Sequence, residues 1–569
     1  MGFIPPSTQE LMMWDWTRFE PLYQAVEESQ ISQENLDTWL ADWSRVSESV
    51  NELYNRLYVA TTRNTADKDV ETRYNAFLDE IFPRSQEAEF RLKQKLFAAK
   101  VTVPSDFEIP LRNIRAEVEL FNSKNLPLQA EEFKLSSEYD RIVGAQTVEW
   151  EGGEKTLAQM QPFIQEPDRA LRERTWRLVT DRQLADRDGL NELWAHFLQV
   201  RLQIASNSGY PDYRSYRWRQ LYRFDYTPED CKRFHSAIER VVVPVAERIY
   251  DRRRIRLGVD SLRPWDIGVD PYNRPPLRPY RTIDELISGV SRIFHHVDQQ
   301  LGADFDLMVR EDLLDLDNRK HKAPGGYCTN FDLVRLPFIF SNAVSTHDDV
   351  QTLLHEGGHS FHVFESGGLP YYPQLNVGAE FAEVASMGME LLASPFLEQS
   401  QGGFYSRQDA ARAQIENLET NILFWPYMAV VDAFQHWVYE NPELSIQPAA
   451  CDSAWGQLWT RFMSGMDWSG LDEARVTGWQ RKHHIFQYPF YYVEYGMAML
   501  GAVQVWANAL HDQAGAVAAY RRALALGGTA ALPDLYAAAG ARLSFDEKTL
   551  QNAVALMEHT IAALEPAAQ

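Results

Sequence analysis

The segment His355-Glu356-Gly357-Gly358-His359 constrains this chain more than any other feature, because its two histidines can act together only if they share a helix. Residues four apart on an α-helix lie on one face, with their Cβ atoms about 5–6 Å apart. Two imidazoles at that spacing can hold a tetrahedral zinc ion that keeps room for a third protein ligand and a water molecule. Glu356 is one residue further along, so its carboxylate can reach that water rather than the metal. The segment therefore predicts a zinc hydrolase, although so short a match also arises by chance.

The residues around this segment predict where its helix begins and ends. Ser345-Thr346-His347-Asp348-Asp349 contains the residue types that cap helix N-termini, and apolar residues at helical spacing follow it. Gly367-Gly368-Leu369-Pro370 would stop the helix, so we expect it to span about residues 348–365. The adjacent Gly357 and Gly358 each cost up to about 1 kcal/mol relative to alanine. We expect another backbone or a substrate to pass close to them; the alternative is a helix break, which would separate the histidines.

A second helix is predicted over residues 378–392, where three glutamates stand among mostly apolar residues. A helix that is apolar on most sides is usually buried, and buried carboxylates need a metal, a cation or hydrogen-bond donors. Glu383 is the central one, and we expect it to be the third zinc ligand. Glu380 and Glu390 are then expected to orient the ligating histidines. A narrow stripe of solvated glutamates is the alternative that the pattern leaves open.

Together these two segments resemble a known protein family. The first motif, followed by Phe381-Ala382-Glu383-Val384-Ala385-Ser386, resembles the M3 metallopeptidases, the family of thimet oligopeptidase and oligoendopeptidase F. The resemblance is stronger to the bacterial oligoendopeptidase F-like branch that includes Pz-peptidases. It covers about residues 324–501 and is much weaker before residue 260.

The resemblance implies roles for the motif residues and a fold for the chain. His355, His359 and Glu383 would bind one zinc ion per chain, and Glu356 would be the catalytic base. The implied fold is mainly α, with two helical lobes around a deep substrate channel and a small β-sheet beside the zinc helix. The implied substrates are short unfolded peptides, because such a channel excludes folded proteins.

A late aromatic segment is expected to contact the substrate. Tyr488, Tyr492 and Tyr495 are at positions i, i+4 and i+7, which is one face of a helix, and such a stripe is usually part of a core. The segment also resembles the family segment that supplies hydrogen-bond donors to the substrate carbonyl and its oxyanion. By that resemblance Tyr495 is the transition-state donor, while His483 and Tyr488 hold the substrate backbone. Tyr492 is either a donor or a packing residue, and His484 competes with His483 for the same role.

A glycine-rich turn at residues 323–329 and a strand at residues 336–342 precede the zinc motif. The strand has the aromatic and β-branched content of a sheet, and Pro337 indicates that it lies at a sheet edge or begins there. An exposed edge beside the zinc could bind an extended peptide as an added strand. We therefore expect Gly326 and Phe338 to contact the substrate. An ordinary buried strand is the alternative.

Length, charge and cysteine content limit the domain organisation, the partners and the location that we expect. The chain has 569 residues, more than one usual core, so we expect an N-terminal helical lobe over about residues 1–205 and a catalytic lobe over 206–569. Long amphipathic patterns favour helices through most of both lobes.

The formal net charge of −24 speaks against nucleic-acid and anionic-membrane partners. Neither a signal peptide nor a membrane span is evident, and the 3 scattered cysteines fit a reducing cytosol. We expect a cytoplasmic protein, with homo-oligomer formation left open.

The function predicted from the sequence is that of a zinc-dependent oligoendopeptidase, which hydrolyses internal bonds of short unstructured peptides. The first alternative is an exopeptidase with the same zinc chemistry, either a dipeptidyl carboxypeptidase or a metallocarboxypeptidase, which would need a cation placed for the substrate C-terminus. The second is a catalytically silent peptide-binding protein. The intact set of His355, Glu356, His359 and Glu383 argues against the silent protein.

Overall fold

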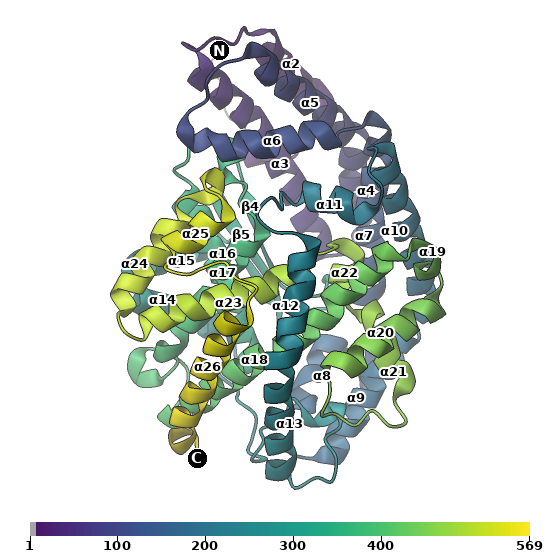
Figure 1. Ribbon diagram of the computed structural model, residues 1–569, viewed down its shortest axis with the longest axis vertical. Helices are drawn as coiled ribbons and strands as arrows, with labels where there is room; N and C mark the ends of the chain where they lie inside the picture. Colours follow the sequence, from purple (N-terminus) through teal and green to yellow (C-terminus); the bar gives the residue numbers. More distant parts are fainter. Residues whose placement is uncertain (1–6) are drawn as a thin grey trace.

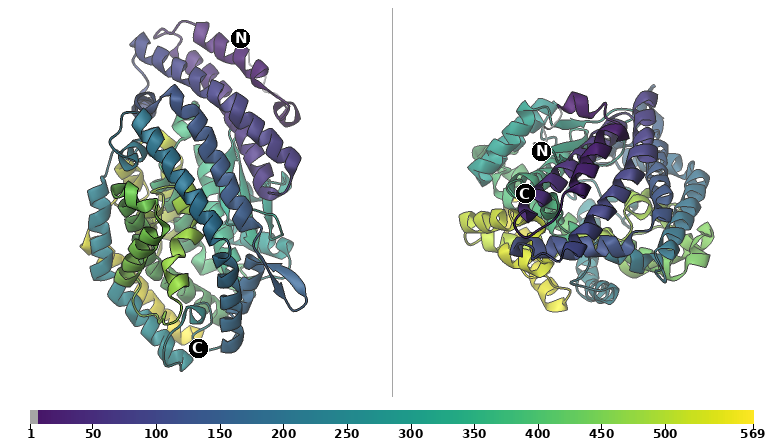
Figure 2. Two further views of the ribbon diagram at one scale, coloured as in Figure 1. Left: turned by 90° about the vertical axis from the view of Figure 1, so that its right-hand side faces the viewer. Right: turned by 90° about the horizontal axis from the view of Figure 1, so that it is seen from above.

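Helices make up most of this chain, and a small sheet lies among them (Figure 1). The computed structural model describes residues 7–569. The first helices lie across one end of the molecule, and the C-terminal helix lies at the opposite end (Figure 2). Six N-terminal helices surround a hydrophobic core that they largely form themselves. They are α1 (Thr8–Leu11), α2 (Trp16–Glu28), α3 (Leu36–Arg63), α4 (Lys68–Ala76), α5 (Phe82–Ala99) and α6 (Glu108–Leu120).

The next part of the chain adds seven helices and one antiparallel hairpin, formed by β1 and β2. These elements are α7 (Leu126–Gly144), β1 (Thr147–Trp150), β2 (Gly153–Thr156), α8 (Leu157–Ile164), α9 (Arg169–Leu184), α10 (Arg187–Asn207), α11 (Tyr213–Gln220), α12 (Pro228–Val241) and α13 (Val243–Leu257).

Two further helices, the three strands of a sheet and the two helices predicted to carry the zinc ligands come next. They are α14 (Ile283–Val297), α15 (Gln299–Arg310), β3 (Leu314–Asp317), β4 (Tyr327–Phe331), β5 (Leu336–Ala343), α16 (His347–Ser366) and α17 (Ala379–Ala393). The C-terminal part is helical: α18 (Arg407–Glu440), α19 (Pro442–Ser445), α20 (Pro448–Phe462), α21 (Asp472–Val476), α22 (His483–Gln487), α23 (Tyr492–Ala509), α24 (Gln513–Leu524), α25 (Leu532–Ala538) and α26 (Glu547–Ala568).

One large hydrophobic core joins most elements from α7 to α26. Tyr139 of α7 and Trp194 of α10 belong to it, together with the buried faces of α16, α17 and α23. In Figure 1, α16 and α17 lie on one side of the molecule, and α10, α19 and α20 lie on the other. The mainly α fold predicted from the sequence is confirmed, whereas the division into lobes at about residue 205 stays a prediction.

Three strands form a sheet in the order β3-β5-β4, with β5 in the centre. β5 runs parallel to β3 and antiparallel to β4. Of the two positions that Pro337 allowed, an edge or a strand start, the second is found, because β5 begins at Leu336. Pairing with β3 starts only at Ile339, so the missing N–H of Pro337 leaves no bond to β3 unmade. The strand at residues 336–342 is therefore the central strand, and β4 is the edge strand that lies near the zinc motif.

Helix α16 extends one residue beyond its predicted bounds at each end and is unbroken. Thr346 and Asp349 form a capping box at its start. A Cβ atom added to Gly358 would lie 2.5 Å from the carbonyl oxygen of Ala385, which belongs to the backbone of α17. The expected close backbone is therefore present, and the alternative of a helix break is wrong. The glycine lets α16 and α17 approach closely enough for their side chains to meet.

Candidate zinc centre and peptide-binding cavity

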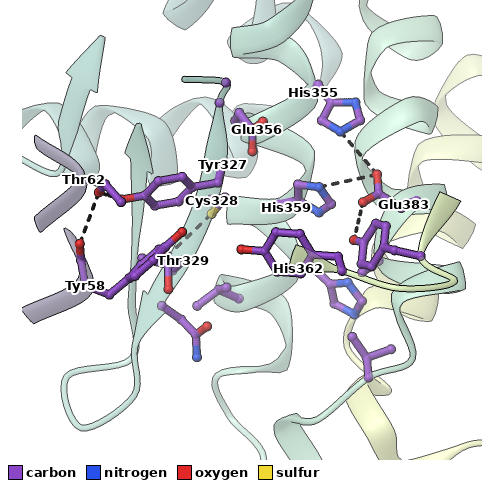
Figure 3. A pocket seen from close by; sticks show the side chains of 18 of the residues that line it. Tyr58, Thr62, Tyr327, Cys328, Thr329, His355, Glu356, His359, His362 and Glu383 are labelled. Carbon is purple, nitrogen blue, oxygen red and sulfur yellow. Dashed lines mark hydrogen bonds and ion pairs between the residues drawn. The ribbon is translucent and has the colours of Figure 1, made fainter. Parts of the chain in front are cut away.

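Two neighbouring helices bring three metal-binding side chains together. α16 carries His355 and His359 one turn apart, and α17 places Glu383 opposite them (Figure 3). One donor atom from each residue lies within 4.8 Å of the other two. Glu383 Oε2 is 3.2 Å from His355 Nε2 and 3.6 Å from His359 Nε2. Two imidazoles and a carboxylate at these separations fit a tetrahedral zinc ion.

Further contacts hold these side chains in place. His355 Nδ1 donates to Glu390 Oε1 over 2.7 Å, which leaves Nε2 free to bind a metal. The Tyr491 hydroxyl donates to Glu383 Oε1 over 2.6 Å, and the Ser386 hydroxyl donates to Glu383 Oε2 over 2.9 Å. The structure thus places Glu390 where an orienting residue is needed. Tyr491 was missed by the sequence analysis, because nothing in the sequence distinguishes it from the tyrosines around it.

Burial and mutual contact perturb the protonation of this cluster. Burial lowers the pKa of His359 to about 4, so its imidazole is neutral at neutral pH, which is the form that binds metal. Burial also opposes the charged form of His355, but hydrogen bonds to Glu383 and Glu390 outweigh it and raise the pKa of His355. Burial disfavours the charge of Glu383 as well, yet His359 and His355 lower the pKa of Glu383 to about 2. A positive charge between Glu383 and Glu390 is therefore favoured, and a bound cation would supply it.

Glu356 lies beside the three ligands without joining them. Its side chain is buried, and its Oε2 atom has no hydrogen-bond partner within residues 7–569. Burial raises the pKa of this carboxyl to about 7, although the nearby His355 opposes the shift. A buried carboxylate that lines a cavity and has an oxygen atom without a partner is suited to bind a water molecule and take its proton.

A cavity of about 400 Å³ lies in front of these residues. One wall consists of β4, α16 and the turn that contains Gly326, whose contact with the substrate stays a prediction. Tyr58 of α3 and Asp140 of α7 also line the cavity, and the Tyr58 ring lies beside that of Tyr327, with centroids 5.6 Å apart. The Thr62 hydroxyl lies 2.6 Å from the Tyr327 hydroxyl, which joins α3 to β4 (Figure 3). Tyr58 and Asp140 were missed because they belong to ordinary amphipathic helices far from the motif.

The tyrosine segment does not form one helical face, so that prediction is wrong. α22 ends at Gln487 and α23 begins at Tyr492, and Phe490 between them has a φ of 65°. Tyr488 lies in this break and lines the cavity. Tyr492 is buried against Phe424, with ring centroids 5.5 Å apart, and is not among the cavity residues. Of its two predicted roles, the structure places Tyr492 in packing.

Both histidines of the segment reach the cavity, and both lie near Tyr488, since the His484 and Tyr488 ring centroids are 6.1 Å apart. His484 Nε2 is 3.0 Å from the hydroxyl of Tyr495, the predicted transition-state donor. The His483 ring lies at a steep angle to the Tyr488 ring, with centroids 6.2 Å apart. His484 is therefore the histidine that contacts the predicted donor.

Glu380 does not reach the ligating histidines, contrary to the prediction. It accepts a hydrogen bond from the Tyr226 hydroxyl over 2.6 Å and lies 3.7 Å from Arg223 Nε. The reason is its register on α17. A step of seven residues rotates a side chain by only about 20°, so Glu390 stays on the face of Glu383, whereas a step of three rotates Glu380 by about 60°.

Phe338 also lies outside the cavity. Its ring packs against Phe331, with centroids 5.8 Å apart, and its side chain is buried. The prediction failed because β5 is the central strand of its sheet, so its aromatic side chains form part of the core.

Comparisons with known proteins agree with the fold and with the motifs. Residues 163–555 match the sequence model of peptidase family M3. Pz peptidase A, in a structure with an inhibitor, is 27% identical, with a TM-score of 0.90 over 99% of this chain and 98% of that one. A provisionally named oligoendopeptidase F is 26% identical, with a TM-score of 0.90 over 100% of this chain and 99% of that one.

A further structure supports the fold alone. A provisionally named oligoendopeptidase F from Bacillus anthracis strain Ames is 24% identical, with a TM-score of 0.86 over 100% of this chain and 98% of that one. A comparison with curated proteins finds no match. Within residues 7–569, no helix has both the length and the apolar content to cross a membrane. The family match covers more than half of the sequence and includes the zinc motif and the helix after it, so the chain belongs to peptidase family M3 as an oligoendopeptidase F-like member.

Proposed function

We propose that this protein is a zinc-dependent oligoendopeptidase that hydrolyses internal bonds of short, unstructured peptides. The observation that carries the proposal is the buried carboxyl of Glu356, whose Oε2 atom has no hydrogen-bond partner among residues 7–569, next to three converging ligand atoms that face the same cavity. His355, His359 and Glu383 would hold the zinc ion. When bound there, zinc supplies a Lewis acid that polarises a water molecule and the substrate carbonyl.

The proton transfers fall to Glu356. As general base it takes a proton from the attacking water, and it then delivers that proton to the nitrogen of the leaving amine. A pKa of about 7, raised by burial, suits a group that must both accept and release a proton near neutral pH.

Tyr495 and His484 would stabilise the negative charge that develops on the substrate oxygen. Burial, with the adjacent His483 and Lys482, lowers the pKa of His484 well below its usual value, so this imidazole is neutral. If its proton is on Nε2, His484 donates to the oxygen of Tyr495, and the tyrosine keeps its own proton to donate into the cavity. Such a donor acts where charge develops in the transition state.

The arrangement favours cleavage within a peptide. A second cavity, of about 370 Å³, shares Gly326, His355 and Glu356 with the first, so the catalytic residues have space on two sides. A peptide can then continue beyond the scissile bond in both directions. β4 offers an outer strand along which its backbone could lie. A cytoplasmic location stays a prediction.

Digestion of peptides blocked at both ends tests this function. We expect internal cuts, seen by mass spectrometry, that stop when a chelator removes the metal and return when zinc is added. Glu356→Gln should keep one zinc per chain and lower kcat by about 10²–10⁴-fold, because only the proton transfers are lost. Glu383→Ala should lose both zinc and turnover. A requirement for a free terminus would instead support the exopeptidase alternative.

A further inference from the structure

The second cavity differs in chemistry from the first. It is lined by the first turns of α16, a stretch of α18 and Glu390 of α17, and we name it the acidic cavity. Its carboxylates beyond the catalytic Glu356 are Asp348, Glu390 and Glu416, and no lysine or arginine of residues 7–569 is among its lining residues. His347 also faces it, but burial lowers the pKa of this imidazole, which is therefore neutral at neutral pH.

Two of these carboxylates lack partners. Neither Asp348 nor Glu416 forms a side-chain hydrogen bond or an ion pair within the described part of the chain, whereas Glu390 accepts from His355. Asp348 is accessible to water, yet the surrounding protein and the charge of Glu416 raise its pKa to about 6. The next residue, Asp349, caps α16, whereas Asp348 forms no comparable side-chain contact.

The two arginines whose charges act on Glu416 do not pair with it. Burial raises the pKa of Glu416, and Arg253 and Arg412 only oppose that shift from a distance. Arg412 donates to Asp270 over 3.1 Å and to Asp409 over 2.8 Å. The guanidinium of Arg253 donates to a backbone carbonyl instead. The acidic cavity thus holds negative charge that no residue of its own wall neutralises.

Unpartnered amides in the same wall indicate that a ligand belongs there. Asn421 is buried, with only 6% of its surface exposed, and its Nδ2 atom has no hydrogen-bond partner among residues 7–569. The Oε1 atom of Gln351 is also buried and unpartnered. Both residues line the acidic cavity. Buried amide groups are normally hydrogen-bonded, and a peptide backbone supplies both the acceptor and the donor that these two lack.

The two cavities therefore offer a peptide different environments on the two sides of Glu356. The first is lined by aromatic rings, Tyr58, Tyr327, Tyr488 and Tyr491 among them, which suit apolar side chains. The acidic cavity suits a cation. A lysine or arginine side chain carries its charge on a long stem and can reach carboxylates that a backbone lying near Glu356 does not touch.

We propose that the acidic cavity is a specificity subsite that binds a lysine or arginine side chain of the peptide substrate next to the scissile bond. This inference rests on the proposed peptidase function and adds a substrate class to it. Asp348 and Glu416 would pair with the cation, and Asn421 would hold the peptide backbone. The free α-amino group of a peptide carries the same charge without the long stem. The test must therefore distinguish a cationic side chain from a peptide N-terminus.

The test uses internally quenched peptides blocked at both ends that differ only by Lys, Arg, Leu or Glu at one position, placed in turn on each side of the cleaved bond. For the wild-type enzyme we expect kcat/KM for Lys and Arg to exceed that for Leu by about tenfold or more at one position, with Glu poorest. In the double variant Asp348→Asn, Glu416→Gln the ratio of Lys to Leu should fall toward one. Glu443→Gln, an exposed residue outside both cavities, is the matched control and should keep the preference.

Several outcomes would overturn the inference. Equal kcat/KM for all four residues, or a preference for cations that survives in the double variant, excludes the acidic cavity as a cation subsite. A preference seen only with peptides that have a free α-amino group assigns the cavity to the peptide terminus instead. Failure to cleave any peptide would overturn the proposed function itself. Melting temperatures of the variants show whether they fold. We expect little change, because neither carboxylate has a hydrogen-bond or ion-pair partner within the described residues that its substitution would leave unpaired.

Discussion

Glu380 and Glu390 stand on one helix and differ in register, and the structure gives them different partners. Glu390 accepts the Nδ1 proton of His355, which fixes the tautomer of this proposed zinc ligand. Glu380 accepts from Tyr226 and lies near the buried guanidinium of Arg223. The sequence placed both on one stripe, because spacing alone cannot show that a rotation of about 60° turns one of them toward a different neighbour.

This difference predicts the effect of two matched substitutions. Glu390→Gln should weaken zinc binding by about 10–100-fold, because the ligand His355 loses its charged partner. Glu380→Gln should leave the zinc affinity unchanged and lower the melting temperature, since it weakens a buried contact with Arg223. Competition with a chelator of known affinity measures the first effect, and thermal unfolding measures the second. Equal zinc affinities in the two variants would remove Glu390 from its orienting role.

Tyr495 and Tyr492 provide a second matched pair, one turn apart at the start of α23. Tyr495 lines the cavity with its hydroxyl beside His484, whereas Tyr492 is buried away from it. We expect Tyr495→Phe to lower kcat by about 10²–10³-fold with little change in KM, because an oxyanion donor acts mainly in the transition state. Tyr492→Phe should keep a kcat near that of the wild type. A normal kcat for a stable Tyr495→Phe enzyme would leave His483 and Tyr488 as the candidate donors.

At the scale of elements, local sequence signals defined the zinc helices well. The capping residues before α16 and the glycines after it set its bounds to within one residue, and the apolar pattern of α17 did nearly the same. Strand order could not be predicted, because it depends on pairing between β3 and β5, which is not a local property. The break before α23 does have a local signal, which the sequence analysis missed: Pro489 disfavours a helical conformation at Tyr488, and Phe490 after it has a positive φ.

The packing of α16 on α17 leads to a prediction for Gly358. A methyl group there would lie 2.5 Å from the Ala385 carbonyl oxygen and the Ser386 Cα atom, and backbone cannot yield as a side chain can. Gly358→Ala should therefore destabilise the protein by about 1–3 kcal/mol and weaken zinc binding, because the helices that carry the ligands must separate. Gly368→Ala is the control, since a Cβ atom there meets nothing within 4 Å. Denaturant unfolding and zinc titration of both variants test this, and equal stability would contradict it.

At the scale of the whole molecule, the cavity is assembled from segments far apart in the chain. The catalytic wall comes from β4, α16 and α17, whose motifs the sequence displays, whereas Tyr58 and Asp140 reach it from α3 and α7. Those two positions carry no motif, and only the packing of the N-terminal helices against the rest of the chain brings them to the site. The sequence therefore predicted the cluster of His355, His359 and Glu383, but not the residues that α3 and α7 add to the cavity.

The N-terminal helices and the rest of the chain both line the first cavity, so we predict that only unfolded substrates are cleaved. Cavities of about 400 and 370 Å³ hold a few side chains of an extended peptide, and a folded domain cannot enter them. One cleavable sequence should be compared as a free peptide and as an insert in an exposed loop of a stable small protein. If local opening of that loop costs about 4 kcal/mol, the insert should be cut about 10³-fold more slowly. A destabilised version of the carrier should restore cleavage at the same bond. Comparable rates for the free peptide and the folded insert would mean that the walls around Glu356 part widely in solution, and the cavity would then not limit substrate size.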